Sequence, residues 1–206
     1  MRNWKIYYKK HSIRKPRKQL LRALDFCVNK ESALDLGSGT LVESKAIIKN
    51  GFKKVVAIDN SPDTEIFARN FKSKKLDFHK TSFRKFKFKK ETFDLINAQF
   101  ALPFYGKRNF KSFIKKILTS LKTEGVFVGQ FFGVRDEWNI SGSILVFNTK
   151  KEIREFFSGL ELIELIEEEE KKETVSGDTK KWHVFHFIVR KKAKGVQRRK
   201  PSLHTG

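Results

Sequence analysis

The stretch from Ser32 to Thr40 constrains the fold of this chain more than any other. An apolar run, Ala33 to Leu36, ends in Gly37-Ser38-Gly39, and a helical pattern from Leu41 to Asn50 follows at once. A strand, a glycine turn and a helix form the unit that brings backbone N–H groups to a ligand at a helix N-terminus. Glycine suits this turn because a side chain would hold the ligand away from the backbone. The stretch therefore predicts a ligand site at the end of a strand in an α/β fold.

Charge at this turn restricts the ligand. Asp35 lies at its mouth, where a carboxylate repels phosphate, and the Lys-Ser/Thr pair that closes a P-loop is missing. An acidic mouth favours a ligand with a cationic group, such as an amino acid end. A second apolar run, Lys54 to Ile58, ends in Asp59, at the spacing of an acid that accepts hydrogen bonds from ribose hydroxyls.

Together these residues resemble the class I S-adenosylmethionine-dependent methyltransferases. The first motif of that family is an acid, any residue and then Gly-x-Gly, which reads here Asp35-Leu36-Gly37-Ser38-Gly39, and its second acid matches Asp59. The resemblance implies S-adenosylmethionine as cofactor. It also implies a doubly wound, Rossmann-like α/β fold with a seven-stranded sheet, mostly parallel with an antiparallel last strand. Leu41 stands where the family often has a third glycine. NAD binding is a weaker alternative, because Val42 replaces the last glycine of Gly-x-Gly-x-x-Gly.

A narrower resemblance is to small bacterial methyltransferases of the tellurite-resistance type. It rests on the Tyr7-Tyr8 pair, the segment from Asn97 to Phe104 and the strand from Trp182 to Phe187. This resemblance implies a small acceptor, thiol-like or metalloid-like.

The family resemblance also implies where the other cofactor contacts lie. Ser82 follows the third predicted strand, Leu76 to Lys80, at the place where the family often has an acid that meets the adenine, and the N–H of Phe83 is a substitute contact. Asn97, Ala98 and Phe100 lie at the end of the fourth predicted strand, Phe93 to Gln99, and just after it, where the family holds the methionine portion. The predicted cofactor-binding residues are Asp35, Gly37, Ser38, Gly39, Asp59, Asn60, Ser82, Phe83, Asn97, Ala98 and Phe100.

Candidate acceptor-binding residues come from three segments: Tyr8 and Arg14 in the N-terminal segment, Phe104 and Tyr105 after the fourth strand, and Arg135 and Trp138 in the loop from 133 to 146. The aromatic N-terminal segment serves either as a lid over the cofactor or as an anchor. Ring faces at Phe104 and Tyr105 suit a sulfonium or a substrate, or else simply pack the loop. The Asn/Asp-Pro-Pro-aromatic motif of nucleic-acid amino-methyltransferases is absent, which argues against methylation of an exocyclic base amine.

His183 is the candidate general base, because an antiparallel last strand begins at the edge of the sheet where ligands bind. The alternative is a histidine that is packed and hydrogen-bonded within the strand. No metal site is predicted. Removing the Asp59 carboxylate is expected to weaken cofactor binding far more than folding, unless Asp59 caps the helix that begins near Pro62.

Composition sets the class of protein. The chain has 206 residues, 39% of them hydrophobic, which suits one α/β domain. We expect that domain to span residues 1–190, with an N-terminal lid and helix in 1–30, and residues 191–206 to form a disordered basic tail. A single cysteine rules out an internal disulfide, and neither a membrane-span run nor a secretory h-region is visible. We therefore expect a cytoplasmic monomer or homodimer.

The net charge of +22 has two interpretations. One is nucleic-acid binding through phosphate contacts; the other is a surface covered evenly by solvated lysines. The second is favoured because no nucleic-acid-binding module is visible. The predicted reaction is therefore methyl transfer to a small-molecule O, N or S acceptor. An RNA methyltransferase and a non-catalytic RNA-binding module are the alternatives.

Overall fold

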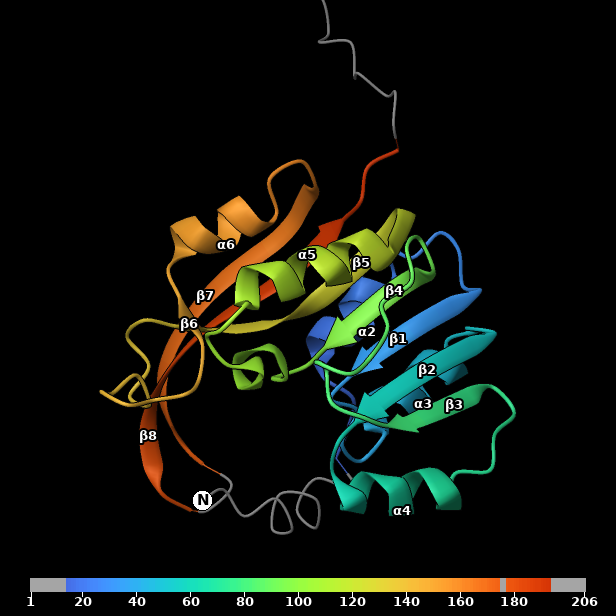
Figure 1. Cartoon of the computed structure of the whole chain (residues 1–206), viewed down its shortest axis with the longest axis horizontal. Helices are drawn as coiled ribbons and strands as arrows, with labels where there is room; N and C mark the ends of the chain where they lie inside the picture. The colour runs from blue at the N-terminus through green and yellow to red at the C-terminus, as the bar shows by residue number, and fades with distance from the viewer. Residues whose placement is uncertain (1–13, 175–176, 194–206) are drawn as a thin grey trace, which may run out of the picture.

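A twisted sheet forms the middle layer of this computed structural model, which describes residues 14–174 and 177–193 (Figure 1). Its strands are β1 (Ser32–Leu36), β2 (Lys54–Asp59), β3 (Leu76–Lys80), β4 (Phe93–Ala98), β5 (Leu121–Gly133), β6 (Phe147–Asn148), β7 (Glu161–Glu173) and β8 (Thr179–Arg190). They lie in the order β3-β2-β1-β4-β5-β8-β7, and β6 pairs with β5. Most of the predicted lid, with Tyr8, lies outside the described residues.

Strand directions match the predicted fold class. β1 to β5 pair in parallel, and β8 lies antiparallel between β5 and β7. The chain leaves β1 for β2 on one side and returns to β4 on the other, so β1 and β4 flank a topological switch point, where such sheets bind ligands. The sheet has eight strands rather than seven because two residues, β6, pair with the end of β5 at Phe132 and Gly133.

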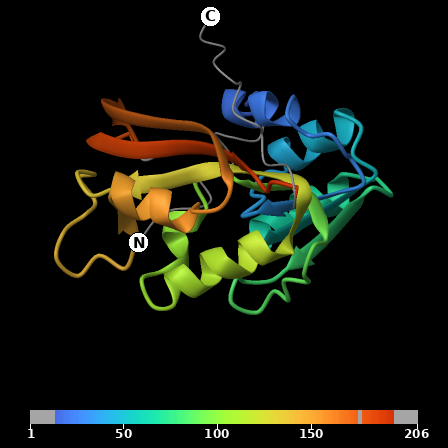
Figure 2. The same ribbon diagram turned by 90° about the horizontal axis from the view of Figure 1, so that it is seen from above.

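Helices cover both faces of the sheet (Figure 2). They are α2 (Lys18–Leu24), α3 (Val42–Lys49), α4 (Pro62–Asn70), η1 (Leu102–Tyr105), α5 (Phe110–Ser120) and α6 (Lys150–Phe156). The apolar faces of α2 and α3 belong to one core cluster, and those of α5 and α6 belong to another. α6 begins with a capping box, in which Thr149 and Glu152 exchange side-chain and backbone hydrogen bonds.

The segment between β3 and β4 covers the sheet beside α5 without forming a helix. Phe83 stacks on Phe113 of α5 at a centroid distance of 5.7 Å, and Phe88 meets the same ring edge-on at 5.9 Å. Because aromatic residues alternate with basic ones in this segment, the rings turn inward while Lys87 and Lys89 are exposed. Its end is fixed to the last turn of α5 by backbone hydrogen bonds.

The folded chain continues past the predicted boundary at residue 190. Lys191 exchanges backbone hydrogen bonds with Glu124 and Gly125 at the start of β5, and the backbone N–H of Ala193 donates to the Glu124 carboxylate at 2.8 Å. Residues 191–193 are therefore part of the domain rather than of the tail. In the part of the chain that the structure describes, no helix has the length and apolar character needed to cross a bilayer.

Candidate functional site

A cleft of about 970 Å³ opens at the carboxyl ends of β1, β2 and β4. It brings together residues from segments far apart in the sequence. The lining includes the predicted residues Arg14, Asp35, Gly37, Ser38, Gly39, Asp59, Asn60, Ser82, Phe83, Asn97, Phe100, Phe104 and Tyr105. Ala98 does not line the cleft; it is buried in the core behind the cleft wall.

The glycine turn has a different role from the predicted one. The N–H groups of Gly37 and Ser38 donate to the Ile58 carbonyl at 2.9 and 3.1 Å, and that of Gly39 donates to the Asp59 carboxylate at 2.9 Å. These three donors therefore hold the turn against the end of the second strand, while all three residues line the cleft as predicted. Glycine is needed for space, because a Cβ at Gly37 would lie 2.8 Å from that of Ala101, and the φ of Gly37 is +70°.

Asp59 joins the glycine turn after β1 to the start of α4. One of its carboxylate oxygens accepts the Gly39 N–H and the other accepts the Ser61 N–H, both at 2.9 Å. The side chain that caps α4 is Ser61, which accepts the Asp63 N–H at 3.2 Å. Asp59 thus fixes the glycine turn as well as facing the cleft, so removing its carboxylate should lower stability as well as cofactor affinity. Burial raises the pKa of Asp59.

Asp35 is almost entirely buried, with 1% of its surface exposed. Its carboxylate accepts hydrogen bonds from Ser44 at 2.5 Å and from the Asn97 amide at 2.8 Å. Burial, and after it the nearby Glu43 carboxylate, raises the pKa of Asp35 to about 7. A cation that binds next to this carboxyl group lowers its pKa, because a positive charge favours the ionised form. Asp35 is therefore suited to bind a cationic group.

A chain of side-chain amides extends from Asp35 to the far wall of the cleft. Asn97 accepts from Gln99, Gln99 accepts from Gln130, and Gln130 accepts from the backbone N–H of Phe100, each at 2.8 Å. A backbone N–H only donates, so it fixes the orientation of every amide in the chain and directs the last donor at Asp35. Gln130 thereby holds Phe100, whose φ of +54° is unusual for a large side chain.

Arg14 and Glu43 form a buried pair at the cleft wall. The two guanidinium nitrogens each donate to a carboxylate oxygen at 2.5 Å, and the Glu43 side chain is 5% exposed. The sequence gives no sign of this pair, because Glu43 reads as an ordinary residue of α3 and its partner lies 29 positions earlier. Gln99 and Arg84 also line the cleft without having been predicted.

Aromatic rings form the other end of the cleft. The Tyr105 ring is parallel to that of Phe113 at 4.0 Å, and the Arg84 guanidinium lies over it at 4.3 Å. The Arg17 guanidinium lies 4.3 Å over the Phe100 ring. These contacts hold the rings in place, so this end has the apolar character of a small-molecule pocket.

Besides Ala98, three predicted residues of the described chain do not line the cleft: His183, Arg135 and Trp138. β5 and β8 extend past the end of β4, whose last residue pairs with Gly129, whereas His183 lies beside Gly133. The four residues from Gly129 to Gly133 therefore place His183 about 13 Å beyond the end of β4. The buried imidazole accepts the Arg135 N–H at 3.0 Å and contacts Glu167 at 3.0 Å. The general-base role of His183 therefore has no geometrical support.

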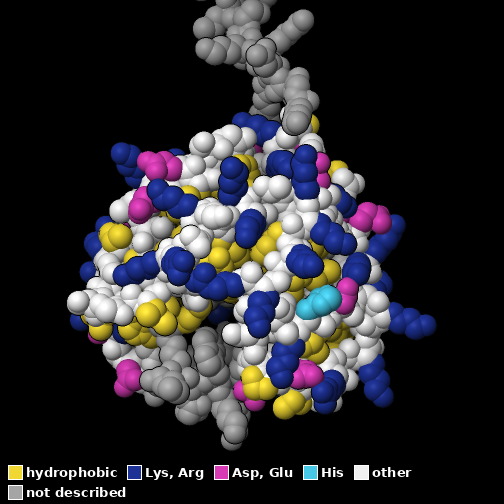
Figure 3. All heavy atoms as spheres, viewed as in Figure 1, with side chains coloured by type: hydrophobic (Ala, Val, Ile, Leu, Met, Phe, Trp, Pro, Cys, Tyr) yellow, Lys and Arg dark blue, Asp and Glu magenta, His cyan; other side chains and the backbone are white. Residues whose placement is uncertain are grey.

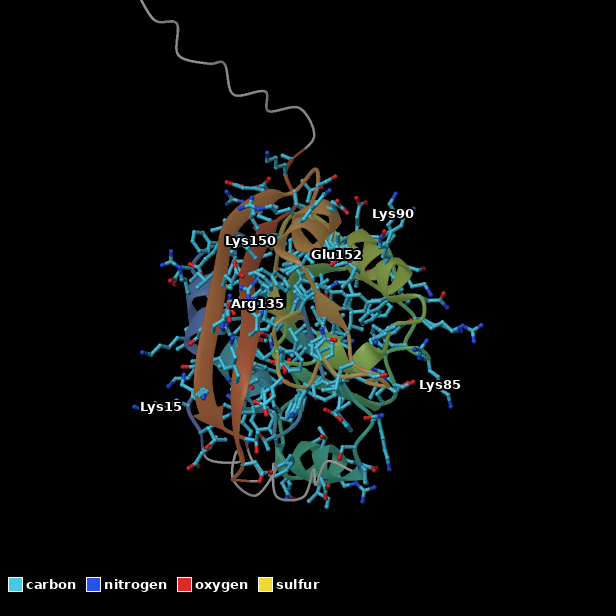
Figure 4. All side chains as sticks on the ribbon, turned by 90° about the vertical axis from the view of Figure 1, so that its left-hand side faces the viewer. Lys15, Lys85, Lys90, Arg135, Lys150 and Glu152 are labelled. Carbon is cyan, nitrogen blue, oxygen red and sulfur yellow. The ribbon has the colours of Figure 1, made fainter. Side chains whose placement is uncertain are left out.

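Arg135 and Trp138 have structural partners instead. The Arg135 guanidinium lies on the outer side of the β7–β8 hairpin, where it pairs with Glu167 and Glu169 (Figure 4). Those two carboxylates and His183 are close enough to hold a metal ion, but the Arg135 guanidinium already lies among them. Trp138 packs on Lys180, whose ammonium lies 3.7 Å from the ring centre.

The cleft fits S-adenosylmethionine in three respects. The Ser38 hydroxyl is buried in the wall and has no hydrogen-bond partner among the described residues, so a ligand atom would satisfy it. Asp35 suits the ammonium of the methionine end. Asp59 lines the cleft at the end of β2, the place from which an acid accepts hydrogen bonds from ribose hydroxyls.

This chain is similar to known methyltransferases in part of its sequence and in its fold. Residues 34–129 match the family model described as a methyltransferase domain. A search of curated proteins gave no match. Many solved structures share the fold. TehB of Haemophilus influenzae superposes with a TM-score of 0.74 at 18% identity, over 90% of this chain and 66% of that one.

Two further structures show the same fold. A methyltransferase of Methanosarcina mazei described as S-adenosylmethionine-dependent gives a TM-score of 0.65 at 16% identity, over 88% of this chain and all of the other. The 1,6-didemethyltoxoflavin-N1-methyltransferase of Burkholderia thailandensis, solved with S-adenosylhomocysteine, gives 0.60 at 15% identity over 85% and 79%. The matched domain and the acid–glycine–acid cleft support a class I S-adenosylmethionine-dependent methyltransferase, and the solved structures show that the chain has the fold of such enzymes.

Proposed function

We propose that this enzyme transfers a methyl group from S-adenosylmethionine to an O, N or S atom of a small-molecule acceptor. The observation that carries this proposal is the two-ended cleft. Asp35, Ser38 and Asp59 line one end, and Phe100, Phe104 and Tyr105 line the other. A volume of about 970 Å³ is near the upper end of the range for small-molecule sites and has room for a cofactor and a small acceptor.

The residues of the cleft have separate tasks in this proposal. S-adenosylmethionine supplies a methyl group that its sulfonium already activates. Asp59 accepts hydrogen bonds from the ribose hydroxyls, and Asp35 binds the ammonium group of the methionine end. The aromatic end holds the acceptor and excludes water, so that catalysis rests mainly on alignment of the nucleophile with the methyl carbon.

A nucleic-acid acceptor is the second candidate. One observation favours it: an exposed basic surface borders the cleft and reaches its lining at Arg84.

Two experiments test the proposal in order. Calorimetry with S-adenosylhomocysteine should give a micromolar Kd, whereas NAD at the same concentration should give no heat. The second measures S-adenosylhomocysteine formation with thiols, with tellurite and selenite, and with total RNA as acceptors. Turnover with a small acceptor and none with RNA supports the proposal, and turnover with RNA alone replaces it with the second candidate. Absence of cofactor binding at millimolar ligand would refute methyl transfer itself.

A further inference from the structure

Positive charge is distributed very unevenly along this chain. Residues 78–123 contain twelve Lys or Arg and two acidic residues, while β7 contains seven acidic residues and two lysines. Lysines spread evenly as a solvating coat would not produce this contrast. The excess positive charge is therefore concentrated on one part of the fold.

Ten of the twelve basic residues are exposed on the side of the sheet that α5 covers. They are Arg84, Lys85, Lys87, Lys89, Lys90, Lys107, Arg108, Lys111, Lys115 and Lys116, and we call them the α5 basic surface. Among the described residues none of them forms an ion pair with a carboxylate, and the undescribed residues contain no Asp or Glu. Figure 3 shows basic side chains across this face and acidic ones mainly at its margin.

The two segments of this surface lie side by side. At one end the Arg84 guanidinium donates to the Tyr105 carbonyl at 2.8 Å, just before α5. At the other end the N–H groups of Glu91 and Thr92 donate to carbonyls in the last turn of α5. Eleven helical residues span about 16 Å, so the surface is an elongated strip. Lys85 and Lys90 lie along it in Figure 4, away from Arg135.

Folding alone does not explain these charges. Lys111 lies in the first turn of α5, where the helix dipole disfavours a cation, and the turn contains no acidic residue. Lys111 and Lys115 are four residues apart on one helix face, and such like-charge pairs cost about 0.2–0.5 kcal/mol. Residues that lower the stability of the fold without a compensating structural contact indicate a functional role.

The chemistry of the strip favours one class of partner. The phenylalanines between its lysines pack inward on Phe113, and the exposed large apolar side chains of the described chain all lie outside residues 78–123. A membrane-binding surface would insert apolar groups, and a protein interface would have an apolar core. A strip that offers only cations suits a phosphodiester backbone.

We propose that the α5 basic surface binds the backbone of single-stranded nucleic acid and leads it to the cleft at Arg84. The strip ends where Arg84 and Tyr105 line the cleft, so a strand bound along α5 has its end at the aromatic wall. This proposal concerns binding and does not depend on which molecule accepts the methyl group.

The test measures fluorescence anisotropy of labelled 20-nucleotide RNA and DNA with the full chain, without S-adenosylmethionine, over a series of salt concentrations. One variant combines Lys85→Gln, Lys87→Gln, Lys89→Gln and Lys111→Gln. The matched control combines Lys49→Gln, Lys72→Gln, Lys74→Gln and Lys75→Gln, which remove the same charge from exposed positions at the end of α3 and before β3. Calorimetry with S-adenosylhomocysteine checks that both variants keep the cleft.

We expect the first variant to raise the Kd for the oligonucleotide at least about tenfold. The slope of log K against the logarithm of the salt concentration should become shallower by about 2–3 units, because each phosphate contact with a single strand contributes about 0.7 to that slope. The control should stay within about twofold of the unmodified chain. Equal losses in both variants would overturn the proposal, because attraction would then depend on net charge alone. Tighter binding to vesicles with anionic lipid, or to polyglutamate, would also overturn it. A lower Kd for RNA than for DNA, or the reverse, identifies which nucleic acid this surface binds.

Discussion

Removal of the Asp59 carboxylate tests both roles that the structure gives to this residue. In Asp59→Ala the N–H groups of Gly39 and Ser61 lose their acceptor. A buried donor left unsatisfied costs about 1–3 kcal/mol. Gly39 is half-buried, so water replaces part of one bond. We therefore expect the free energy of unfolding to fall by about 2–4 kcal/mol.

The same substitution should weaken cofactor binding. Loss of a charge-assisted hydrogen bond to a ribose hydroxyl contributes about 1.5–3 kcal/mol, which corresponds to a rise of at least about tenfold in the Kd of S-adenosylhomocysteine. Urea unfolding gives the stability, and calorimetry on the same preparation gives the affinity.

Two further variants separate the roles. Asp59→Asn keeps one acceptor oxygen, so its stability should lie between those of the alanine variant and the unmodified chain. Ser61→Ala removes the cap of α4 and should cost about 0.5–2 kcal/mol in stability while leaving the affinity within about twofold. If Asp59→Ala unfolds like the unmodified chain, Asp59 does not fix the glycine turn. If its affinity is unchanged, the ribose contact is refuted.

Three other predictions follow from the described contacts. Because burial raises the pKa of Asp35 to about 7, its ionisation costs stability as pH rises from about 4 to about 7. Asp35→Asn should accordingly be more stable than the unmodified chain at pH 8, by up to about 4 kcal/mol, and equal to it at pH 4; a constant difference in urea unfolding across this range would disprove the raised pKa. Gln130→Leu leaves the Phe100 N–H without its acceptor and should lower stability by about 1–3 kcal/mol and S-adenosylhomocysteine affinity severalfold. Gln130→Glu still accepts from Phe100, but when ionised it cannot donate to Gln99 and buries a carboxylate, so it should lose stability at pH 8 and regain part of it at pH 4; equal stability of this variant and the unmodified chain at pH 8 would count against the amide chain. Deletion of residues 191–206 should lower the Tm by about 2–6 °C more than deletion of 194–206, because only the longer deletion removes the bonds to β5; equal melting curves would contradict this.

Local patterns in the sequence were enough to predict the order of the elements and the cofactor end of the site. The apolar run, glycine turn and helix around Gly37 are consecutive, and Asp59 ends the next strand. Residues at the ends of neighbouring parallel strands meet at one edge, whatever the details of packing. That rule alone brings Asp35, Asp59, Ser82 and Asn97 to the same cleft.

Hydrogen-bond partners within the cleft were not predictable in this way. The Arg14–Glu43 pair and the Gln130–Phe100 bond join segments that are separated by 29 and 30 residues. Neither pair has a spacing that a helix or a strand would place in contact. Only the packing of α2 and α3 on the sheet, and of β5 beside β4, brings these partners together.

The position of His183 shows the same limit on the acceptor side. The sequence identifies an antiparallel last strand, but not how far that strand extends past the sheet edge. β5 and β8 stabilise each other for several residues beyond the end of β4, because each supplies the hydrogen bonds that the other needs there. Strand pairing at that distance depends on the whole sheet, so the tertiary structure alone decides that Phe100 and Tyr105, and not His183, face the cleft.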